Sequence, residues 1–234
     1  MQPNLRTVTV DARATAAWSA DASAYERVRP GWPPAAVDWL CAGLPDGAPV
    51  LDLAAGTGKL TRDLVARGYA VTAVEPLPGM RAQLASVAPV VLEGVAESIP
   101  CADGAFAIVF VAEAFHWFSA PAAVAEMRRV APRAGLLWNL EAWENEPWYP
   151  ALHALLGPGR GHHPGRRGTW DGLGDAEARR FAHEHTLSAE GFAQLVGTWS
   201  RVAARPDRAE LLHRVRDTVP DPVELRYETL AVAA

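Results

Sequence analysis

Cysteine is scarce in this chain of 234 residues, which contains only Cys41 and Cys101. The two lie far apart in the sequence, and neither belongs to a C-x-x-C pair. A disulfide framework is therefore not expected, and the cysteine content fits a protein of a reducing compartment.

Long apolar runs and an excess of basic charge are also missing. No run approaches the ~20 apolar residues of a membrane-spanning helix, and the first segment, MQPNLRTVTVDARAT, lacks the apolar core of a signal peptide. The net charge is −5, whereas nucleic-acid binders usually present a basic face. We therefore expect a cytoplasmic protein with no nucleic-acid or membrane partner. The sequence leaves its oligomeric state open.

The residues that are present have an ordinary globular composition, 50% hydrophobic and 21% charged. A chain of this length fits one main α/β domain with a small cap. Nine tryptophans are many. They either pack in the core or form an aromatic wall for a ligand.

Short apolar segments alternate with helical segments from residue 50 onward. The expected strands are residues 50–54, 70–74, 90–92, 106–111 and 135–139. The expected helices are residues 33–41, 59–67, 80–87 and 120–130. Near-continuous apolar strands that alternate with helices indicate a parallel sheet covered on both faces, which is the doubly wound α/β architecture.

The C-terminal third changes character. Residues 157–168 form a basic segment rich in glycine and proline, for which a mobile surface loop is favoured over an anion site. A helix is expected over 189–196. Residues 223–232 alternate in part between apolar and polar, which predicts an antiparallel edge strand.

The central motif is VLDLAAGTGKLT, residues 50–61. Its small residues let a ligand approach the backbone closely. Asp52 and the free N–H groups at the start of the following helix suit a ligand's ammonium and carboxylate groups respectively. Glu75, at the end of the second strand, suits the two hydroxyls of a ribose. Together these features favour a cofactor of nucleoside type.

Two other nucleotide motifs fit the same segment poorly. A dinucleotide fingerprint requires a third glycine where this chain has Thr61. A phosphate-binding P-loop requires a glycine at the position of Leu53 and Ser or Thr at that of Leu60.

The segments LDLAAGTGKLT, AVEP, GVAESIPCADGAFAIVF and AEAFHWF resemble the successive motifs of class I S-adenosylmethionine-dependent methyltransferases. The most similar subgroup is the small-molecule type described as trans-aconitate-methyltransferase-like. The resemblance spans roughly Tyr25 to Trp148 and continues weakly to the C-terminal strand. It implies S-adenosylmethionine as cofactor, and a mostly parallel seven-stranded sheet with an antiparallel C-terminal edge strand and an N-terminal helical cap.

We expect three segments: a cap (1–45), a Rossmann-like core that binds the cofactor (46–140), and a part that completes the sheet and the substrate pocket (141–234). The resemblance also implies cofactor contacts at matching positions. These positions are Tyr25, Arg29, Asp52, Ala54, Ala55, Gly56, Thr57, Gly58, Glu75, Pro76, Met80, Ala96, Glu97, Glu113, Ala114 and Phe115.

Three positions depart from the pattern of the family. Ala54 replaces the commoner first glycine of the turn, and its methyl group narrows the approach. Val95 stands where many relatives have Asp, which leaves the adenine to backbone groups. Glu113 stands where the subgroup often has Gln, which adds a charge near the reacting sulfonium.

His116, Trp117 and Asn139 are the candidates for the transfer site. His116 and Trp117 follow the strongest expected strand, at the end where open α/β sheets bind ligands. His116 is either a catalytic base or substrate hydrogen-bond partner, or it orients a loop. Trp117 is a candidate pocket wall. Asn139 either bonds a substrate or caps the next turn.

Other polar clusters favour structural roles. Glu141, Glu144 and Glu146 fit a solvated loop. The pairs His162–His163 and His183–His185 match no common metal-site spacing and have no cysteine partner, so no metal is expected.

The favoured function is methyl transfer to an O, N or C nucleophile of a small molecule. Three alternatives remain: a methyltransferase acting on a macromolecule, a cofactor-binding protein without catalysis, and a nicotinamide-dependent oxidoreductase. Fold analogy alone does not separate them.

Overall fold

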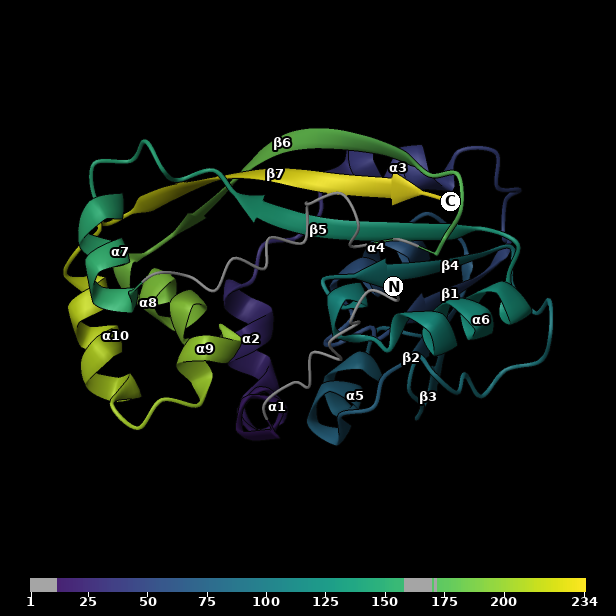
Figure 1. The fold of residues 1–234 in the computed structure, drawn as a ribbon, viewed down its shortest axis with the longest axis horizontal. Helices are drawn as coiled ribbons and strands as arrows, with labels where there is room; N and C mark the ends of the chain where they lie inside the picture. Colours follow the sequence, from purple (N-terminus) through teal and green to yellow (C-terminus); the bar gives the residue numbers. More distant parts are fainter. Residues whose placement is uncertain (1–11, 158–169, 171) are drawn as a thin grey trace, which may run out of the picture.

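The computed structural model describes residues 12–157, 170 and 172–234 (Figure 1). Its strands form one seven-stranded sheet in the order β3-β2-β1-β4-β5-β7-β6. The strands are β1 (Pro49–Leu53), β2 (Ala70–Val74), β3 (Val90–Leu92), β4 (Ile108–Ala112), β5 (Ala134–Glu141), β6 (Glu177–Leu187) and β7 (Val223–Ala233).

Helices precede, connect and follow these strands. The N-terminal helices are α1 (Ala12–Ala20), α2 (Ala22–Val28) and α3 (Pro34–Cys41). Those between the parallel strands are α4 (Lys59–Ala66), α5 (Pro78–Leu84), the 3-10 turn η1 (Phe115–Trp117) and α6 (Ala120–Val130). The later helices are α7 (Tyr149–Leu156), α8 (Ala189–Gly197), α9 (Ser200–Ala203) and α10 (Arg208–Arg216). None of these helices is both long and apolar enough to cross a membrane.

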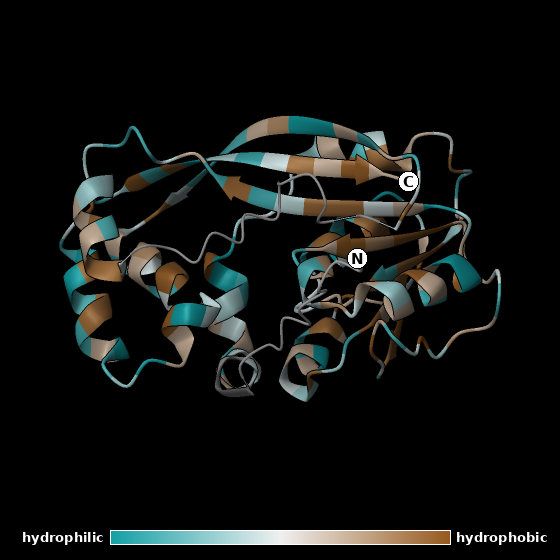
Figure 2. Cartoon of the chain, in the orientation of Figure 1, coloured by the Kyte–Doolittle hydropathy of each residue, from teal (hydrophilic) through white to brown (hydrophobic). Residues whose placement is uncertain are grey.

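The strands β1 to β5 run parallel and are covered on both faces. Successive side chains of a strand point to opposite faces. Val50 accordingly packs with α3 and α4, whereas Leu51 and Leu53 pack with α6. Because both faces are buried, these strands are hydrophobic along their length, as Figure 2 shows for β4. The predicted doubly wound fold is confirmed.

The C-terminal strand β7 is antiparallel, as predicted, and pairs with β5 on one side and β6 on the other. The edge of the sheet is therefore β6, which pairs with β7 over all of its residues. The sequence analysis assigned no strand to this segment. From Arg180 onward, its side chains alternate between exposed and half-buried positions. This pattern is a weaker sequence signal than the continuous apolar run of a buried strand.

A second hydrophobic core lies beyond the parallel half of the sheet. Here α7, α8 and α10 pack on the first residues of β7, around Trp143, Trp148 and Phe192. We call this part the helical lobe. In Figure 1, α1 and α2 lie between the lobe and the parallel strands, and the arrowheads of β4 and β5 point toward the lobe.

Candidate active site

The turn from β1 into α4 has a strained backbone. Ala54, Gly56 and Gly58 have φ values of 57°, 60° and 91°. Glycine adopts this left-handed region without steric cost, whereas an alanine does not. A Cβ atom on Gly58 would also lie 2.8 Å from Leu84 Cδ1. The strain at Ala54 lies at the position where the family commonly has glycine, and unfavourable backbone conformations tend to cluster at functional sites.

Asp52 is buried beneath this turn. Its side chain is 1% exposed, and the Thr61 hydroxyl donates a 2.5 Å hydrogen bond to Oδ2. Among the described residues, Oδ1 has no hydrogen-bond partner. Burial raises the pKa of Asp52 to about 7, although the bond from Thr61 opposes the shift. An unpartnered buried carboxylate oxygen is costly, and a cationic ligand group would offset that cost.

Glu75 lies at the carboxyl end of β2. Its carboxylate accepts hydrogen bonds from the backbone N–H groups of Gly56 at 2.9 Å and Leu77 at 2.8 Å. Burial raises the pKa of Glu75, and these two hydrogen bonds counteract the rise. Because a carboxylate has about four acceptor positions, Glu75 retains capacity for two further donors.

Glu113 follows β4 at the same edge of the sheet and has a left-handed φ of 55°. The backbone N–H of Asn139 donates a 2.6 Å hydrogen bond to its Oε1. Burial raises the pKa of Glu113 to about 7, against the attraction of the Arg29 guanidinium. The pKa of Glu141, at the end of β5, is also raised by desolvation, and the Arg29 guanidinium opposes this rise. This acidic region is suited to positive charge.

Helix α2 is tied to the glycine turn through Glu26. Its carboxylate accepts a short hydrogen bond from the Thr57 hydroxyl and pairs with Arg62 at 2.5 Å and Lys59 at 3.5 Å. The sequence analysis did not single out Glu26, although it named the neighbouring Tyr25 and Arg29. Only the tertiary contact reveals its role.

Tyr25 and Arg29 also belong to this cap. The Arg29 guanidinium lies 5.0 Å from the centre of the Tyr25 ring. Its Nε donates to Thr198 Oγ1 at 2.8 Å, and Nη2 donates to the Thr198 carbonyl at 3.3 Å. Through Thr198, Arg29 therefore connects α2 to the end of α8.

His116 and Trp117 lie in η1, directly after β4. The indole N–H of Trp138 donates to His116 Nδ1 at 3.3 Å. Because an indole nitrogen is a donor only, Nδ1 acts as the acceptor, and a neutral imidazole then carries its proton on Nε2. Trp117 is half-buried and lies 6.4 Å from Trp18 of the cap, measured between ring centres.

Residues 51–138 match the family model described as methyltransferase domain. A solved structure from Anaeromyxobacter dehalogenans, proposed to be a type II methyltransferase, superposes with a TM-score of 0.64 at 26% identity, over 88% of this chain and 97% of that one. Residues 51–138 are therefore similar to a methyltransferase domain, and the chain shares the α/β fold of that solved structure.

Two curated relatives are similar to this chain in sequence. An uncharacterized methyltransferase of Mycobacterium tuberculosis is 46% identical over 140 residues, which is 57% of this chain and 56% of the relative. The match therefore spans about half the length of that protein. An uncharacterized methyltransferase-like protein of Schizosaccharomyces pombe is 28% identical over 92% of this chain and 93% of its own.

The structure brings most of the predicted cofactor residues to one edge of the sheet. Three of them, Met80, Ala96 and Phe115, are buried apolar side chains. Glu97 accepts a hydrogen bond from the Ser119 N–H at 2.7 Å, close to the start of α6. Ala55 and Ala114 are part of the loops after β1 and β4, and Pro76 is exposed after β2. Their ligand contacts remain predictions.

The side chain of Asn139 makes more hydrogen bonds within the protein than its prediction as a substrate residue suggested. Its Nδ2 donates to the Gly31 carbonyl at 3.1 Å. Its Oδ1 bonds to the hydroxyl of Thr229 at 2.6 Å and to His183 Nε2 at 3.1 Å. The side chain thus joins the cap to β6 and β7, which supports a positioning role.

For several tryptophans and for His185, the observed contacts favour a structural role. Trp138, Trp143 and Trp148 are core residues. His185 Nε2 bonds to the Val28 carbonyl at 2.9 Å. His162, His163 and the rest of the basic segment after Gly157 lie outside the described residues.

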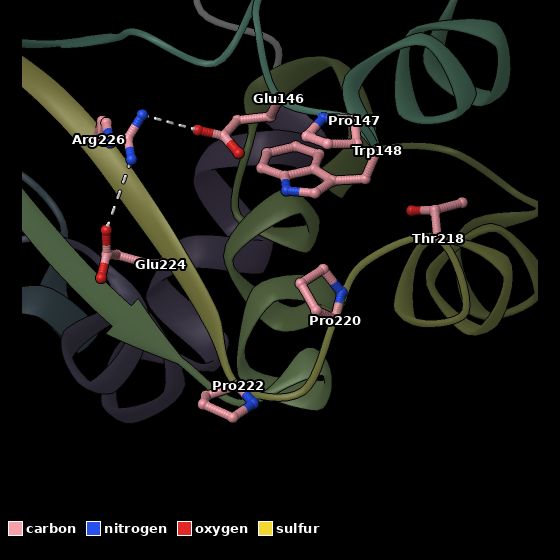
Figure 3. A pocket seen from close by; sticks show the side chains of 8 residues that line it. All are labelled: Glu146, Pro147, Trp148, Thr218, Pro220, Pro222, Glu224 and Arg226. Atoms are coloured by element: carbon pink, nitrogen blue, oxygen red, sulfur yellow. Dashed lines mark ion pairs between the residues drawn. The ribbon is translucent and has the colours of Figure 1, made fainter.

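A separate groove of about 620 Å3 lies on the helical lobe (Figure 3). Trp148 and three prolines contribute to its wall. Arg226 in this groove pairs with Glu146 at 3.4 Å and Glu224 at 4.0 Å. The groove contains none of the predicted cofactor residues, and Arg226 pairs there with both acidic side chains.

Proposed function

We propose that this protein transfers the methyl group of S-adenosylmethionine to an O, N or C nucleophile of a small molecule, by in-line displacement. The observation that carries the proposal is the position of Asp52, Glu75 and Glu113 at the carboxyl ends of three neighbouring strands, the edge of the sheet where the left-handed turn lies. Ligands of open α/β sheets bind at this carboxyl edge.

The residues present fit the cofactor. The unpartnered Oδ1 of Asp52 suits its ammonium group, and the spare acceptor capacity of Glu75 suits its ribose hydroxyls. When bound, S-adenosylmethionine supplies an already activated methyl group on a sulfonium. Burial disfavours the ionised form of Asp52 and Glu113 and raises their pKa values, and a cationic ligand group bound beside them would stabilise that form.

We assign His116 the task of orienting the acceptor by a hydrogen bond from Nε2. The bond from Trp138 to Nδ1 supports this assignment over that of a proton acceptor. Trp117 forms part of the wall of the acceptor site.

The helices that cover the ends of the parallel strands favour a small acceptor. Helices α1 and α2 contact both α5 and the helical lobe: Gly79 N donates to Ser19 Oγ, and Trp18 Nε1 donates to the Thr198 carbonyl. The acidic side chains Glu113 and Glu141 disfavour a polyanionic substrate such as nucleic acid. The trans-aconitate-methyltransferase-like subgroup is our proposal for the branch of the family.

The test is a thermal melt with S-adenosylmethionine, S-adenosylhomocysteine and NAD in parallel. A ligand at ~100 times its Kd adds about 2.7 kcal/mol, which corresponds to a Tm rise of roughly 5–10 °C for a chain of this size. We expect the rise with the two adenosyl ligands only.

The contrary outcomes are equally clear. A rise with NAD alone would replace the proposal by a nicotinamide-dependent oxidoreductase. If the adenosyl ligands bind but screened acceptors yield no S-adenosylhomocysteine, the result would favour a binding protein without catalysis.

A further inference from the structure

The two edges of the sheet differ greatly in length. The edge strand β3 has three residues, whereas the edge strand β6 has eleven. Natural proteins protect long edges with prolines, bulges or lysines, because unpaired backbone groups attract other strands. The β6 segment, EARRFAHEHTL, contains no proline, glycine or lysine, and its register with β7 is continuous.

The hydrogen-bond pattern shows which backbone groups of β6 face outward. Ala134 and Ala234 exchange both hydrogen bonds between β5 and its antiparallel neighbour, so the even-numbered residues of β7 bond to β5. The odd-numbered residues of β7 then bond to odd-numbered residues of β6. The outward N–H and C=O groups of β6 belong to its even-numbered residues. Within the described part of the chain, no strand pairs with them.

These outward residues are self-complementary. They are Ala178, Arg180, Ala182, Glu184 and Thr186, and all are exposed. If two copies of β6 pair antiparallel about a two-fold axis at Ala182, Arg180 of each copy lies directly opposite Glu184 of the other. The small side chains of Ala182 meet at the axis. An axis at Arg180 or at Glu184 would instead place like charges opposite one another.

Directly opposed residues of opposite charge stabilise a strand pair, and like charges destabilise it. Figure 2 shows hydrophilic residues alternating with more hydrophobic ones along β6. Arg180 also pairs with Glu228 of its own chain at 2.7 Å. A guanidinium has five N–H donors, so it has donors for a second carboxylate.

We propose that two copies of this chain pair through β6, with Ala182 at the two-fold axis, to form one sheet continuous across the dimer. An isologous interface of this kind closes on itself. It leaves the carboxyl edge of the parallel strands free, so it does not depend on the proposed methyltransferase site.

The first measurement is the mass of the full chain by light scattering across a concentration series. We expect twice the 25.1 kDa mass of one chain, falling to a single chain on dilution. Ala182→Pro removes an outward N–H without removing a bond to β7, and proline is tolerated at such an edge position. It should weaken the dimer by about 10-fold or more, whereas Ala182→Val, which keeps the N–H, should not.

Charge reversal provides a second, independent test. Arg180→Glu and Glu184→Arg each place like charges opposite one another, so each variant alone should be monomeric. Mixed in equal amounts, they should form a heterodimer, because both pairs then become attractive. Damage to the fold would not produce this recovery.

A wild-type chain that stays at 25.1 kDa at high concentration would overturn the proposal. So would a dimer whose strength is the same in Ala182→Pro and Ala182→Val, or charge variants that do not recover on mixing. Thermal melts of each variant at low concentration check that the monomer remains folded.

Discussion

Replacing Asp52 by asparagine should remove a large part of the pH dependence of stability between about pH 5 and about pH 8. Asp52 is 1% exposed, and burial raises its pKa from 3.8 to about 7. The folded protein therefore favours the protonated acid. The stability that this group contributes is fully present below about pH 4 and is lost as the pH rises through about 7.

The size of the effect follows from the shift. About three pH units correspond to roughly 4 kcal/mol between the low-pH and high-pH limits. Linkage places roughly 2–3 kcal/mol of that loss between about pH 5 and about pH 8. For a chain of this size, the equivalent change in Tm is roughly 5–10 °C.

The assay is urea or thermal unfolding of wild type and Asp52→Asn across this range. Asparagine keeps an oxygen that can accept from Thr61 but does not titrate, so the difference between the two curves isolates the Asp52 carboxyl from other titrating groups. The same change at the exposed Asp46 controls for the substitution itself. Curves for wild type and Asp52→Asn that run parallel over the whole range would refute the reasoning.

Three further substitutions test the site. Ala54→Gly should stabilise the protein by roughly 0.5–1 kcal/mol, because relief of about 1–2 kcal/mol of left-handed strain exceeds the entropic cost of glycine; a lower Tm than that of wild type would contradict this. Glu75→Ala should weaken binding of S-adenosylmethionine by roughly 1–3 kcal/mol in calorimetry, whereas Glu93→Ala, the same change at an exposed position, should not. His116→Ala should reduce turnover by about 10²-fold because the acceptor loses its orienting hydrogen bond, and His116→Gln, which keeps a donor, should retain more activity; wild-type turnover in the alanine variant would leave His116 a purely structural residue.

The parallel half of the fold was predictable because its signals are local. Residues 90–92 and 120–130 coincide with the observed strand and helix, since apolar runs and helix starts are encoded over a few residues. The position of Asp52 and Glu75 at one edge of the sheet was predictable for a related reason. Each ends a parallel strand, and such ends meet at one edge of the sheet.

Other features depend on contacts between residues far apart in the chain. Glu26 meets Thr57 only after α2 folds across the turn, and Arg29 finds Thr198 across 169 positions. The side chain of Asn139, a candidate substrate residue, is bonded to Gly31, His183 and Thr229. A short sequence motif contains no information about such partners.

The sequence by itself determined the parallel strands, the glycine turn and the acids beside it, because periodicity and local spacing encode them. Only the tertiary structure decided that β7 lies inside the sheet and that β6 forms its edge, because strand order depends on pairing between distant segments. Tertiary structure also raised the pKa values of Asp52 and Glu113. Burial by distant parts of the chain removes water from a carboxylate, and no linear pattern of residues specifies that.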